Sequence, residues 1–216
     1  MKYQVKDIIR EVRVALDQNM SSAPLMELGD VDTLSLEEII HSKIADAVRS
    51  VELAVPHHLL DSGLPFGDSI AGNGQSGQGS GYILLPDDFL SLLAFQMSDW
   101  SCAVHDAITP ADPRYALQSS RFPGVRGCPQ KPIVAIVNRS IGKTLEFYSC
   151  TGGKDVAIKQ ASYIPMPKEQ LGVIHIPELI KDAVVYYAAH LVAVSTQQNE
   201  QAKALLAISN TLINNQ

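Results

Sequence analysis

Hydrophobic residues recur every three to four positions at the start of the chain, and this spacing predicts two helices there. The first covers residues 4–19, and the second runs from Ser35 to about Val55. Ser35 is followed three residues later by Glu38, the capping-box pattern in which each side chain satisfies a free backbone N–H at a helix start. Pro56 ends the second helix, because proline disfavours helical geometry in the residue before it.

The C-terminal third has the same helical spacing. Pro177 suits the first position of a helix, and an apolar stripe follows it as far as Val194. We expect a turn at Ser195–Asn199 and a last helix that ends at about residue 213. The inward positions of the longer helix are predicted to be Ile180, Ala183, Val184, Tyr187, Leu191 and Val194.

The middle of the chain changes to short apolar runs bounded by turn residues, which is typical of strands. Strands are predicted at Tyr82–Leu85, where Pro86 ends the run, and along the alternating positions of Leu93–Met97. Ile133–Val137 and Thr144–Ser149 form a predicted hairpin, with Gly142 in the turn, and Val156–Ile164 is a further strand. Residues 101–132 carry five prolines (110, 113, 123, 129 and 132), so we expect a long ordered excursion without regular structure there.

Residues 57–81 have no periodic apolar pattern. Five glycines, at 72, 74, 77, 79 and 81, lie among Asn, Gln and Ser, and no charge occurs between Asp68 and Asp87. Such a segment buries too little apolar surface to offset the entropy lost on ordering. We therefore expect Gly72–Gly81 to be a flexible loop in the free subunit, ordered only against a neighbour.

The order of these elements predicts an α+β fold, in which helices and strands are segregated along the chain. The N- and C-terminal helices are expected to pack together as a bundle, and an antiparallel β subdomain is expected as an insertion between them in the sequence. The predicted parts are a helical hairpin at 1–56, the Gly-rich loop at 57–81, the β-rich subdomain at 82–165 and a second helical hairpin at 176–213.

Composition narrows the function classes. The chain has 216 residues, with 17 Lys and Arg against 23 Asp and Glu, a formal charge of −6. This balance argues against a protein that grips nucleic acid by its phosphates, since such a surface needs clustered cations. Three cysteines cannot form a closed disulfide framework, which favours a reducing compartment. The longest apolar stretch, Ala183–Val194, is shorter than the roughly 20 residues that span a bilayer.

Two motifs partly match patterns of cofactor-binding and metal-binding sites. Gly72-Asn-Gly74-Gln-Ser-Gly77 matches the letters of the dinucleotide fingerprint, but it lacks the preceding strand and following helix that hold a pyrophosphate. Cys102 and His105 are spaced as a ligand pair, whereas a structural zinc site shows two such pairs. The other thiols, Cys128 and Cys150, are scattered. We therefore expect neither a cofactor nor a metal, and cysteines that behave as small hydrophobes.

Catalytic alternatives remain open but are not favoured by the pattern. Cys102 with His175 or His190 would be a nucleophile and base, yet nothing marks a cysteine as activated. His57-His58 with Asp61 could titrate or bind metal, and a solvated loop after the helix explains them equally well. Asp87-Asp88 after Pro86 indicates a turn or helix start before a carboxylate pair for acid–base catalysis. The core of the strand-rich half is expected to consist of Leu85, Phe89, Phe95, Trp100 and Tyr148. Phe95 and Trp100 are thus expected in the core rather than on a stacking platform.

Six segments carry a resemblance to a known family: Leu84-Leu85-Pro86-Asp87-Asp88-Phe89-Leu90, Leu93–Met97, Asp99-Trp100, Pro113-Arg114-Tyr115-Ala116-Leu117-Gln118, Lys131–Val137 and Leu145–Tyr148. In this order they resemble the head-to-tail adaptor (tail tubular, or neck ring) proteins of short-tailed bacteriophages, including the crAss-like group. In that family an LP-x-DF segment leads into strands, P-x-Y-x-x-Q and KP segments follow, and the chain then returns to helices.

This resemblance implies a structural virion protein and no enzyme. The protein would form a ring, by resemblance of twelve copies, made in the host cytoplasm and located in the neck or tail of the virion. Its partners would be itself, the portal protein and tail or neck proteins, with DNA passing through the channel without specific binding and no membrane involved. The candidate structural and assembly residues are Leu85, Pro86, Asp88, Phe89, Trp100, Tyr115, Gln118 and Pro132.

Two rivals come from other classes. One is a small intracellular hydrolase or nucleotide-binding enzyme that uses the histidines and the Gly-rich loop. The other is a regulatory interaction module, which would share the helices but not the order from LP-x-DF to KP. Portal and terminase genes beside this one would favour the adaptor, and a metabolic operon would favour the enzyme.

Overall fold

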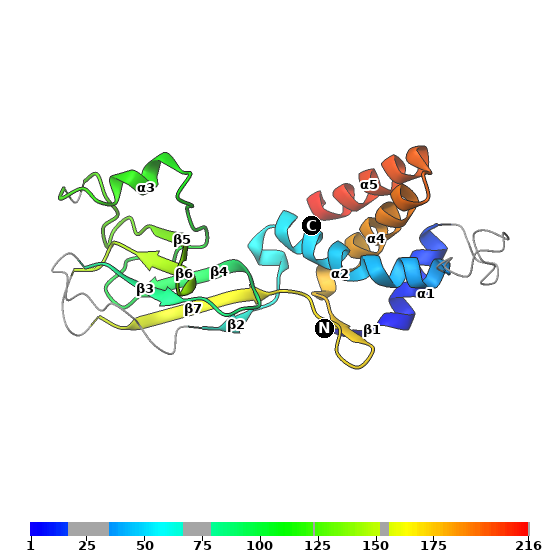
Figure 1. The fold of residues 1–216 in the computed structure, drawn as a ribbon, viewed down its shortest axis with the longest axis horizontal. Helices are drawn as coiled ribbons and strands as arrows, with labels where there is room; N and C mark the ends of the chain where they lie inside the picture. Colours follow the sequence, from blue (N-terminus) through cyan, green and yellow to red (C-terminus); the bar gives the residue numbers. More distant parts are fainter. Residues whose placement is uncertain (17–34, 67–78, 123, 152–155, 216) are drawn as a thin grey trace. The chain divides into compact units, whose positions relative to one another are not determined.

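The computed structural model describes residues 1–16, 35–66, 79–122, 124–151 and 156–215. The chain forms two compact units (Figure 1). The helical unit consists of Met1–Asp61 and Pro167–Gln216, and the strand unit consists of Ser62–Met166. Helices and antiparallel strands are both present and lie in different parts of the chain, which is consistent with the predicted α+β class.

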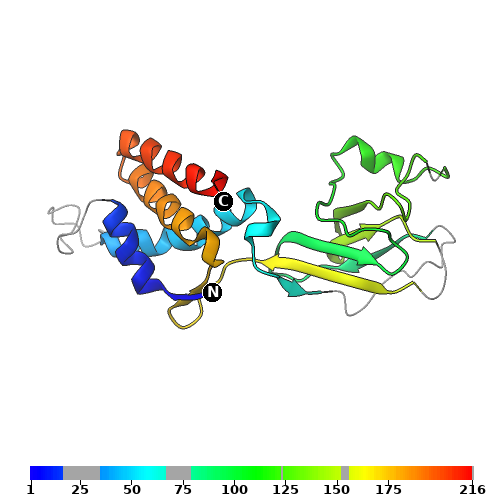
Figure 2. The same ribbon diagram turned by 180° about the vertical axis from the view of Figure 1, so that it is seen from behind.

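The described residues of the helical unit form four α-helices. They are α1 (Val5–Ala15), α2 (Leu36–Ala54), α4 (Lys181–Ser195) and α5 (Asn199–Asn214). The turn between α4 and α5 places these two helices side by side and antiparallel (Figures 1 and 2). All four helices were expected from the 3-to-4 spacing, because a periodic apolar stripe is a local signal that a single helix carries by itself.

The helix ends show where local rules hold. The predicted capping box is confirmed at the start of α2, since the Ser35 hydroxyl accepts from the Glu38 N–H and the Glu38 carboxylate accepts from the Ser35 N–H at 2.7 Å. Helix α1 ends at Ala15, and residues 17–19 of the predicted helix lie outside the described residues. Pro177 is not the first residue of α4: it precedes the 3₁₀ turn η2 (Glu178–Ile180), after which α4 begins.

A small sheet in the helical unit was not predicted. Strand β1 (Lys2–Gln4) pairs antiparallel with β8 (Val173–His175). This pairing joins the segment directly before α1 to the segment that precedes η2 and α4. Each strand has three residues, too few for an alternating pattern to be recognised. The partners are also far apart in sequence, and only the folded helices bring them together.

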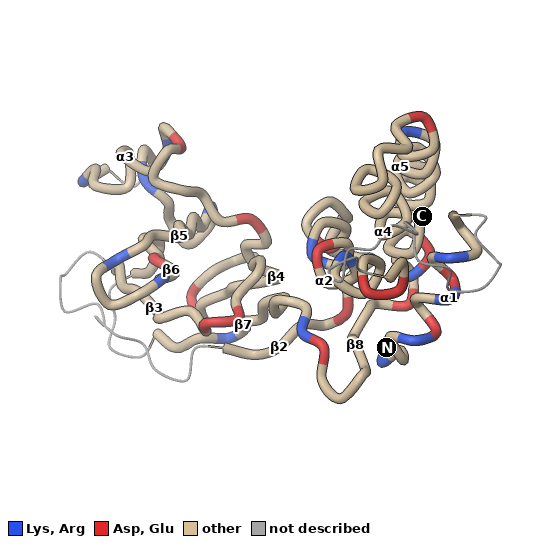
Figure 3. Tube along the Cα trace, turned by 45° about the vertical axis from the view of Figure 1, so that its right-hand side comes forward, with Lys and Arg blue, Asp and Glu red and all other residues tan. Residues whose placement is uncertain are grey.

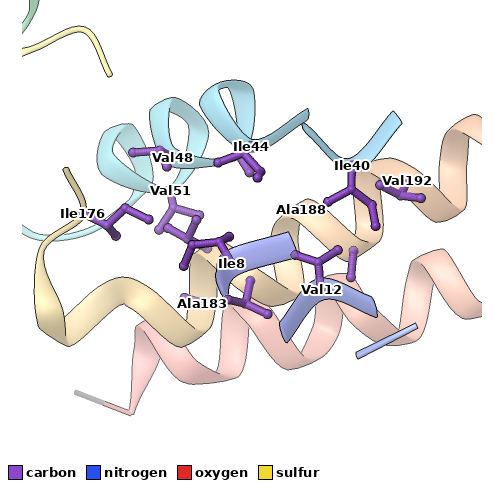
Figure 4. Packing of buried hydrophobic residues seen from close by; sticks show 14 of the residues in the cluster. Ile8, Val12, Ile40, Ile44, Val48, Val51, Ile176, Ala183, Ala188 and Val192 are labelled. Atoms are coloured by element: carbon purple, nitrogen blue, oxygen red, sulfur yellow. The ribbon is translucent and has the colours of Figure 1, made fainter. Parts of the chain in front are cut away.

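The core of the helical unit is aliphatic. Side chains from α1, α2 and α4 point into a common interior, as Figure 4 shows for part of the cluster. Ile8, Val12 and Ile40 are fully buried. The small residues of α4 on this face let neighbouring helices approach closely; they are Ala183, Ala188, Ala189 and Ala193.

In the part of the strand unit that the structure describes, the strands form two three-stranded antiparallel sheets. One has the order β2 (Leu64–Pro65), β7 (Ile158–Pro165), β4 (Phe89–Met97), and the other has the order β3 (Gly81–Leu84), β6 (Gly142–Phe147), β5 (Val134–Arg139). The predicted hairpin is confirmed as β5–β6. Gly142 adopts a φ of +127° at its turn, a conformation that glycine reaches without steric cost.

Two sequence expectations need correction. The excursion at 101–132 is not free of regular structure, because its described residues include the short helix α3 (Pro113–Leu117). Outside residues 67–78, which the structure does not describe, the segment 57–81 is not a structureless loop. It contains the 3₁₀ turn η1 (His57–Leu59), the strand β2 and the first residue of β3. Each of these depends on pairing or packing with distant residues, which an aperiodic sequence does not reveal.

The core of the strand unit is rich in aromatic rings. Phe95 is fully buried and lies 5.5 Å from Trp100, 6.1 Å from Phe147 and 6.2 Å from Phe66, measured between ring centroids. Leu85, Phe89, Phe95 and Trp100 belong to this core, as expected. Tyr148 does not: it is half-buried, and its hydroxyl bonds to Glu146 instead.

Candidate functional site

The LP-x-DF segment forms a corner between β3 and β4. Leu85 is buried, and its N–H donates to the Lys143 carbonyl at 2.9 Å, which extends the pairing of β3 with β6. The Phe89 N–H donates to the Pro86 carbonyl at 3.1 Å and closes a turn. Asp87-Asp88 lies in this turn, so the turn interpretation of the two carboxylates is confirmed. The corner connects one sheet of the strand unit to the other.

Asp88 fastens this corner to the end of β7. Its carboxylate accepts from the Tyr163 hydroxyl at 2.8 Å, and its carbonyl accepts from the Met166 N–H at 2.6 Å. The Phe89 ring stacks on the Tyr163 ring with centroids 5.7 Å apart. Burial, followed by the bond to Asp88, raises the pKa of Tyr163 to about 12, so this hydroxyl keeps its proton at neutral pH. The corner therefore links the start of β4 to the end of β7 by hydrogen bonds and a ring contact.

A second constellation holds the excursion against the other sheet. Glu146 on β6 is buried, and it accepts from Nε of Arg139 at 2.8 Å. The hydroxyls of Tyr115 (3.4 Å) and Tyr148 donate to the same carboxylate. The Arg139 guanidinium also lies over the Tyr82 ring, 4.8 Å from its centroid. Tyr115, predicted as an assembly residue, thus contacts an ion pair whose carboxylate is buried and which the sequence pattern did not reveal.

The hydrogen bonds of this network hold the structure together, and its donors remain protonated. Burial and the hydrogen bond to Glu146 raise the pKa of Tyr148 far above its ordinary value, so this phenol is a permanent donor. The bond to Glu146 raises the pKa of Arg139 as well. Both donors therefore stay in the protonation state that the carboxylate needs, and neither serves as a base near neutral pH.

Gln118 links helix α3 to Gly127, nine residues further along the chain. Its Oε1 accepts from the Gly127 N–H at 2.9 Å, and its Nε2 donates to the Arg114 carbonyl at 2.8 Å. At Gly127 a Cβ would lie 2.4 Å from Oγ of Ser149, so a larger residue does not fit without a shift. Pro132 is half-buried at the end of the excursion, directly before the N–H of Ile133 that donates to Ser149 at 3.0 Å.

The cysteine alternatives find little support in the geometry. Cys102 is exposed, and Nδ1 of His105 lies 2.7 Å from the Leu93 carbonyl oxygen. Cys150 is buried, and burial raises the pKa of its thiol to about 12. Because the thiolate is the nucleophile, Cys150 is unreactive near neutral pH. Within the described ranges, no group of three or more His, Cys, Asp and Glu side chains could hold a metal ion.

All histidines except His105 belong to the helical unit. Nε2 of His175 is 3.2 Å from the Asp61 carboxylate, and burial is the main cause that lowers the His175 pKa. His57 and His58 open the 3₁₀ turn η1 after α2; His58 is exposed, as the solvated-loop interpretation expects, whereas His57 is half-buried. His175 and His190 belong to a different unit from Cys102. The glycine motif at 72–77 lies outside the described residues.

Glu52 is a buried titratable residue that was not predicted from the sequence. Glu52 on α2 is only 7% exposed, and its Oε2 has no hydrogen-bond partner among the described residues. Burial first, and the negative charge of Asp61 second, raise the pKa of Glu52 to about 7. The available signal was its position, four residues after the buried Val48 and one after Val51, on the inward face of the helix.

Comparisons with known proteins add no family. No protein-family model matches the chain, and a search of the curated proteins finds no match. Within the residues that the structure describes, no helix is both long enough and apolar enough to cross a membrane.

Proposed function

We propose that this protein is the ring-forming head-to-tail connector (adaptor) of a short-tailed bacteriophage, which docks on the portal and extends the DNA channel into the tail. The observation that carries the proposal is where the residues of the resembling segments lie in the strand unit. Leu85, Phe89 and Trp100 lie in the aromatic core of the strand unit, and Asp88, Tyr115 and Gln118 fasten its turns. These residues support a scaffold that presents surfaces, as a structural part of a virion requires.

The two-unit organisation supports the same proposal. Helices from both ends of the chain share one aliphatic core, and the strand unit lies between them in sequence. In the proposed adaptor the helices pack as a bundle, with the β subdomain as an insertion. Twelve such subunits would form a closed ring on the portal, because repeated head-to-tail contacts generate a ring when the rotation closes.

Charge is unevenly divided between the units, and this bears on DNA passage. The helical unit has nine Lys and Arg against fifteen Asp and Glu, a net charge of −6, whereas the strand unit has eight of each. Figure 3 shows acidic residues along the helices of the helical unit. An acidic channel wall repels the duplex and lets it slide, since cationic linings create phosphate contacts that must be broken during ejection.

Electron microscopy of the full-length protein, mixed with the portal protein encoded by the same genome, tests the proposal. We expect rings of twelve subunits on one face of the portal. A variant with Phe89→Ala, which weakens the anchored corner, should give fewer decorated portals, whereas the exposed Ile141→Ala should decorate portals like the wild type. Portals that stay bare with folded wild-type protein would contradict the adaptor function.

A gel shift with duplex DNA tests the passive channel separately. At about physiological salt we expect no measurable affinity of the isolated protein, because phosphate binding requires clustered cations. Sub-micromolar binding that weakens with salt would favour a nucleic-acid-binding role over a passive channel. Poly-lysine-induced shifts of the same DNA provide the positive control.

A further inference from the structure

Three large apolar side chains are exposed on the excursion of the strand unit. Leu117 at the end of α3 is 46% exposed, Phe122 is 72% exposed and Val125 is 47% exposed. We call residues 117–122 and 124–126 the excursion tip. Phe122 is the one aromatic residue among the exposed large hydrophobics of the described residues. Large exposed apolar patches mark interaction sites on soluble proteins, so these side chains are candidates for a docking surface.

The excursion tip is held in one arrangement. The Asp112 carboxylate accepts from the Arg114 N–H at 2.8 Å at the start of α3, and Gln118 bonds to Gly127 across the turn. The N–H groups of Val125 (3.0 Å) and Arg126 (3.2 Å) both donate to the Phe122 carbonyl. A surface whose backbone is already ordered loses little entropy when it binds, which favours a docking role for its apolar side chains.

The charge of this region is opposite to that of the helical unit. Residues 113–131 contain Arg114, Arg121, Arg126 and Lys131 and neither Asp nor Glu, although Arg114 forms an ion pair with Asp112 at 2.7 Å. The helical unit carries the whole net charge of −6. It also exposes apolar side chains of its own: Leu53 on α2 is 53% exposed, and Leu179 is 54% exposed beside the exposed Glu178.

We infer that the excursion tip docks on the acidic helical unit of a second copy of this chain. This inference rests on the proposed ring and names the contact between its neighbours. Apolar side chains framed by arginines match an acidic surface with exposed leucines, whereas a nucleic-acid backbone would be bound by cations and polar groups. Contact between two different surfaces is heterologous, so each copy keeps one free tip and one free helical unit until the ring closes.

Site-specific photo-cross-linking of the full-length protein tests the contact. A benzophenone amino acid replaces Phe122, and the protein is irradiated at high concentration, both free and bound to portals. We expect cross-linked dimers whose junctions, found by mass spectrometry, lie within 1–61 or 167–216 of the second copy. Junctions within 62–166 of a second copy, or the absence of dimers in both samples, would overturn the inference.

Matched variants measure the strength of the contact. Phe122→Asp together with Arg121→Glu should lower the self-association constant at least about tenfold in sedimentation equilibrium, the effect of losing a central anchor. Ile141→Asp changes another exposed apolar residue, 56% exposed on the β5–β6 turn, and should leave self-association unchanged. Equal association of the two variants would also overturn the inference.

The outcomes separate this contact from the proposed function. Bare portals together with cross-links to the helical unit would end the connector function and keep the contact between copies. Normal rings formed by the Phe122→Asp, Arg121→Glu variant would keep the connector function and end the contact.

Discussion

The two units of this protein solve the packing problem with different side chains. The helical unit fills its core with Ile, Val, Leu and Ala, and the strand unit fills its core with a cluster of aromatic rings. Helices pack at axis distances of about 8–10 Å, which small residues such as Ala188 allow. Facing sheets stand about 10 Å apart, and rings such as Phe95 and Phe147 fill that space. The type of regular structure therefore decides which side-chain sizes a core accepts.

The units also differ in how they treat buried charge. In the strand unit, buried Glu146 is fully partnered by Arg139, Tyr115 and Tyr148. In the helical unit, buried Glu52 keeps an oxygen without a partner among the described residues, and its pKa rises to about 7. Partners offset the cost of burying a carboxylate, whereas the ionisation of an unpartnered buried carboxylate destabilises the fold as the pH rises.

The largest effect is expected in the aromatic core. Phe95→Ala should destabilise the strand unit by about 3–5 kcal/mol, the usual cost of a large aromatic deletion in a core. Trp100, the chain's single tryptophan, lies against Phe95 and reports on this unit by its fluorescence, while circular dichroism at the helical wavelength reports mainly on the other. Urea denaturation should shift the fluorescence transition alone.

Phe122→Ala is the matched control, because this ring is 72% exposed, and it should change stability by less than about 0.5 kcal/mol. A loss below about 1 kcal/mol for Phe95→Ala would show that the two cores do not differ in their dependence on single large rings.

The second effect concerns Glu52 and has a defined sign. The folded pKa of about 7 lies above the unfolded value of 4.5, so the folded state holds the extra proton between these values. The stability that this provides is complete below about pH 4.5 and is lost as the pH rises through 7. Glu52→Gln, which cannot ionise, should therefore be more stable than the wild type above pH 7, by about 2–3 kcal/mol.

Urea denaturation of the helical unit at pH 5 and at pH 8.5 measures this difference. Asp46→Asn, on the exposed side of the same helix, serves as the control and should follow the wild type at both pH values. Parallel pH curves for the wild type and Glu52→Gln would mean that Glu52 is solvated or partnered in solution.

The smallest effect is expected at the start of α2. Ser35→Ala removes the side-chain half of the capping box and should cost the helical unit about 1 kcal/mol. Ser42→Ala, in the interior of the same helix, should cost nothing or stabilise slightly, because alanine is the better helix former. Thermal unfolding followed at the helical wavelength compares the two. Equal melting temperatures would show that the cap is frayed in solution.

Local patterns were sufficient for much of this fold. The stripes of α1, α2, α4 and α5, the capping box at Ser35 and the hairpin around Gly142 each depend on neighbours within a few residues. Such features form wherever the local sequence favours them, so they can be predicted without knowing the rest of the chain. The burial of Phe95 and Trp100 followed from their size and apolar surface.

Tertiary structure decided the features that carry chemistry. Lys2 pairs with His175, Tyr115 meets Glu146, and Asp88 meets Tyr163, although each pair is separated by dozens of residues or more. Glu52 acquires its raised pKa because the packed helices remove it from water, while the sequence shows only an ordinary acidic residue. Propensity and periodicity are local, whereas desolvation and hydrogen-bond partnership depend on which distant residues the fold brings together.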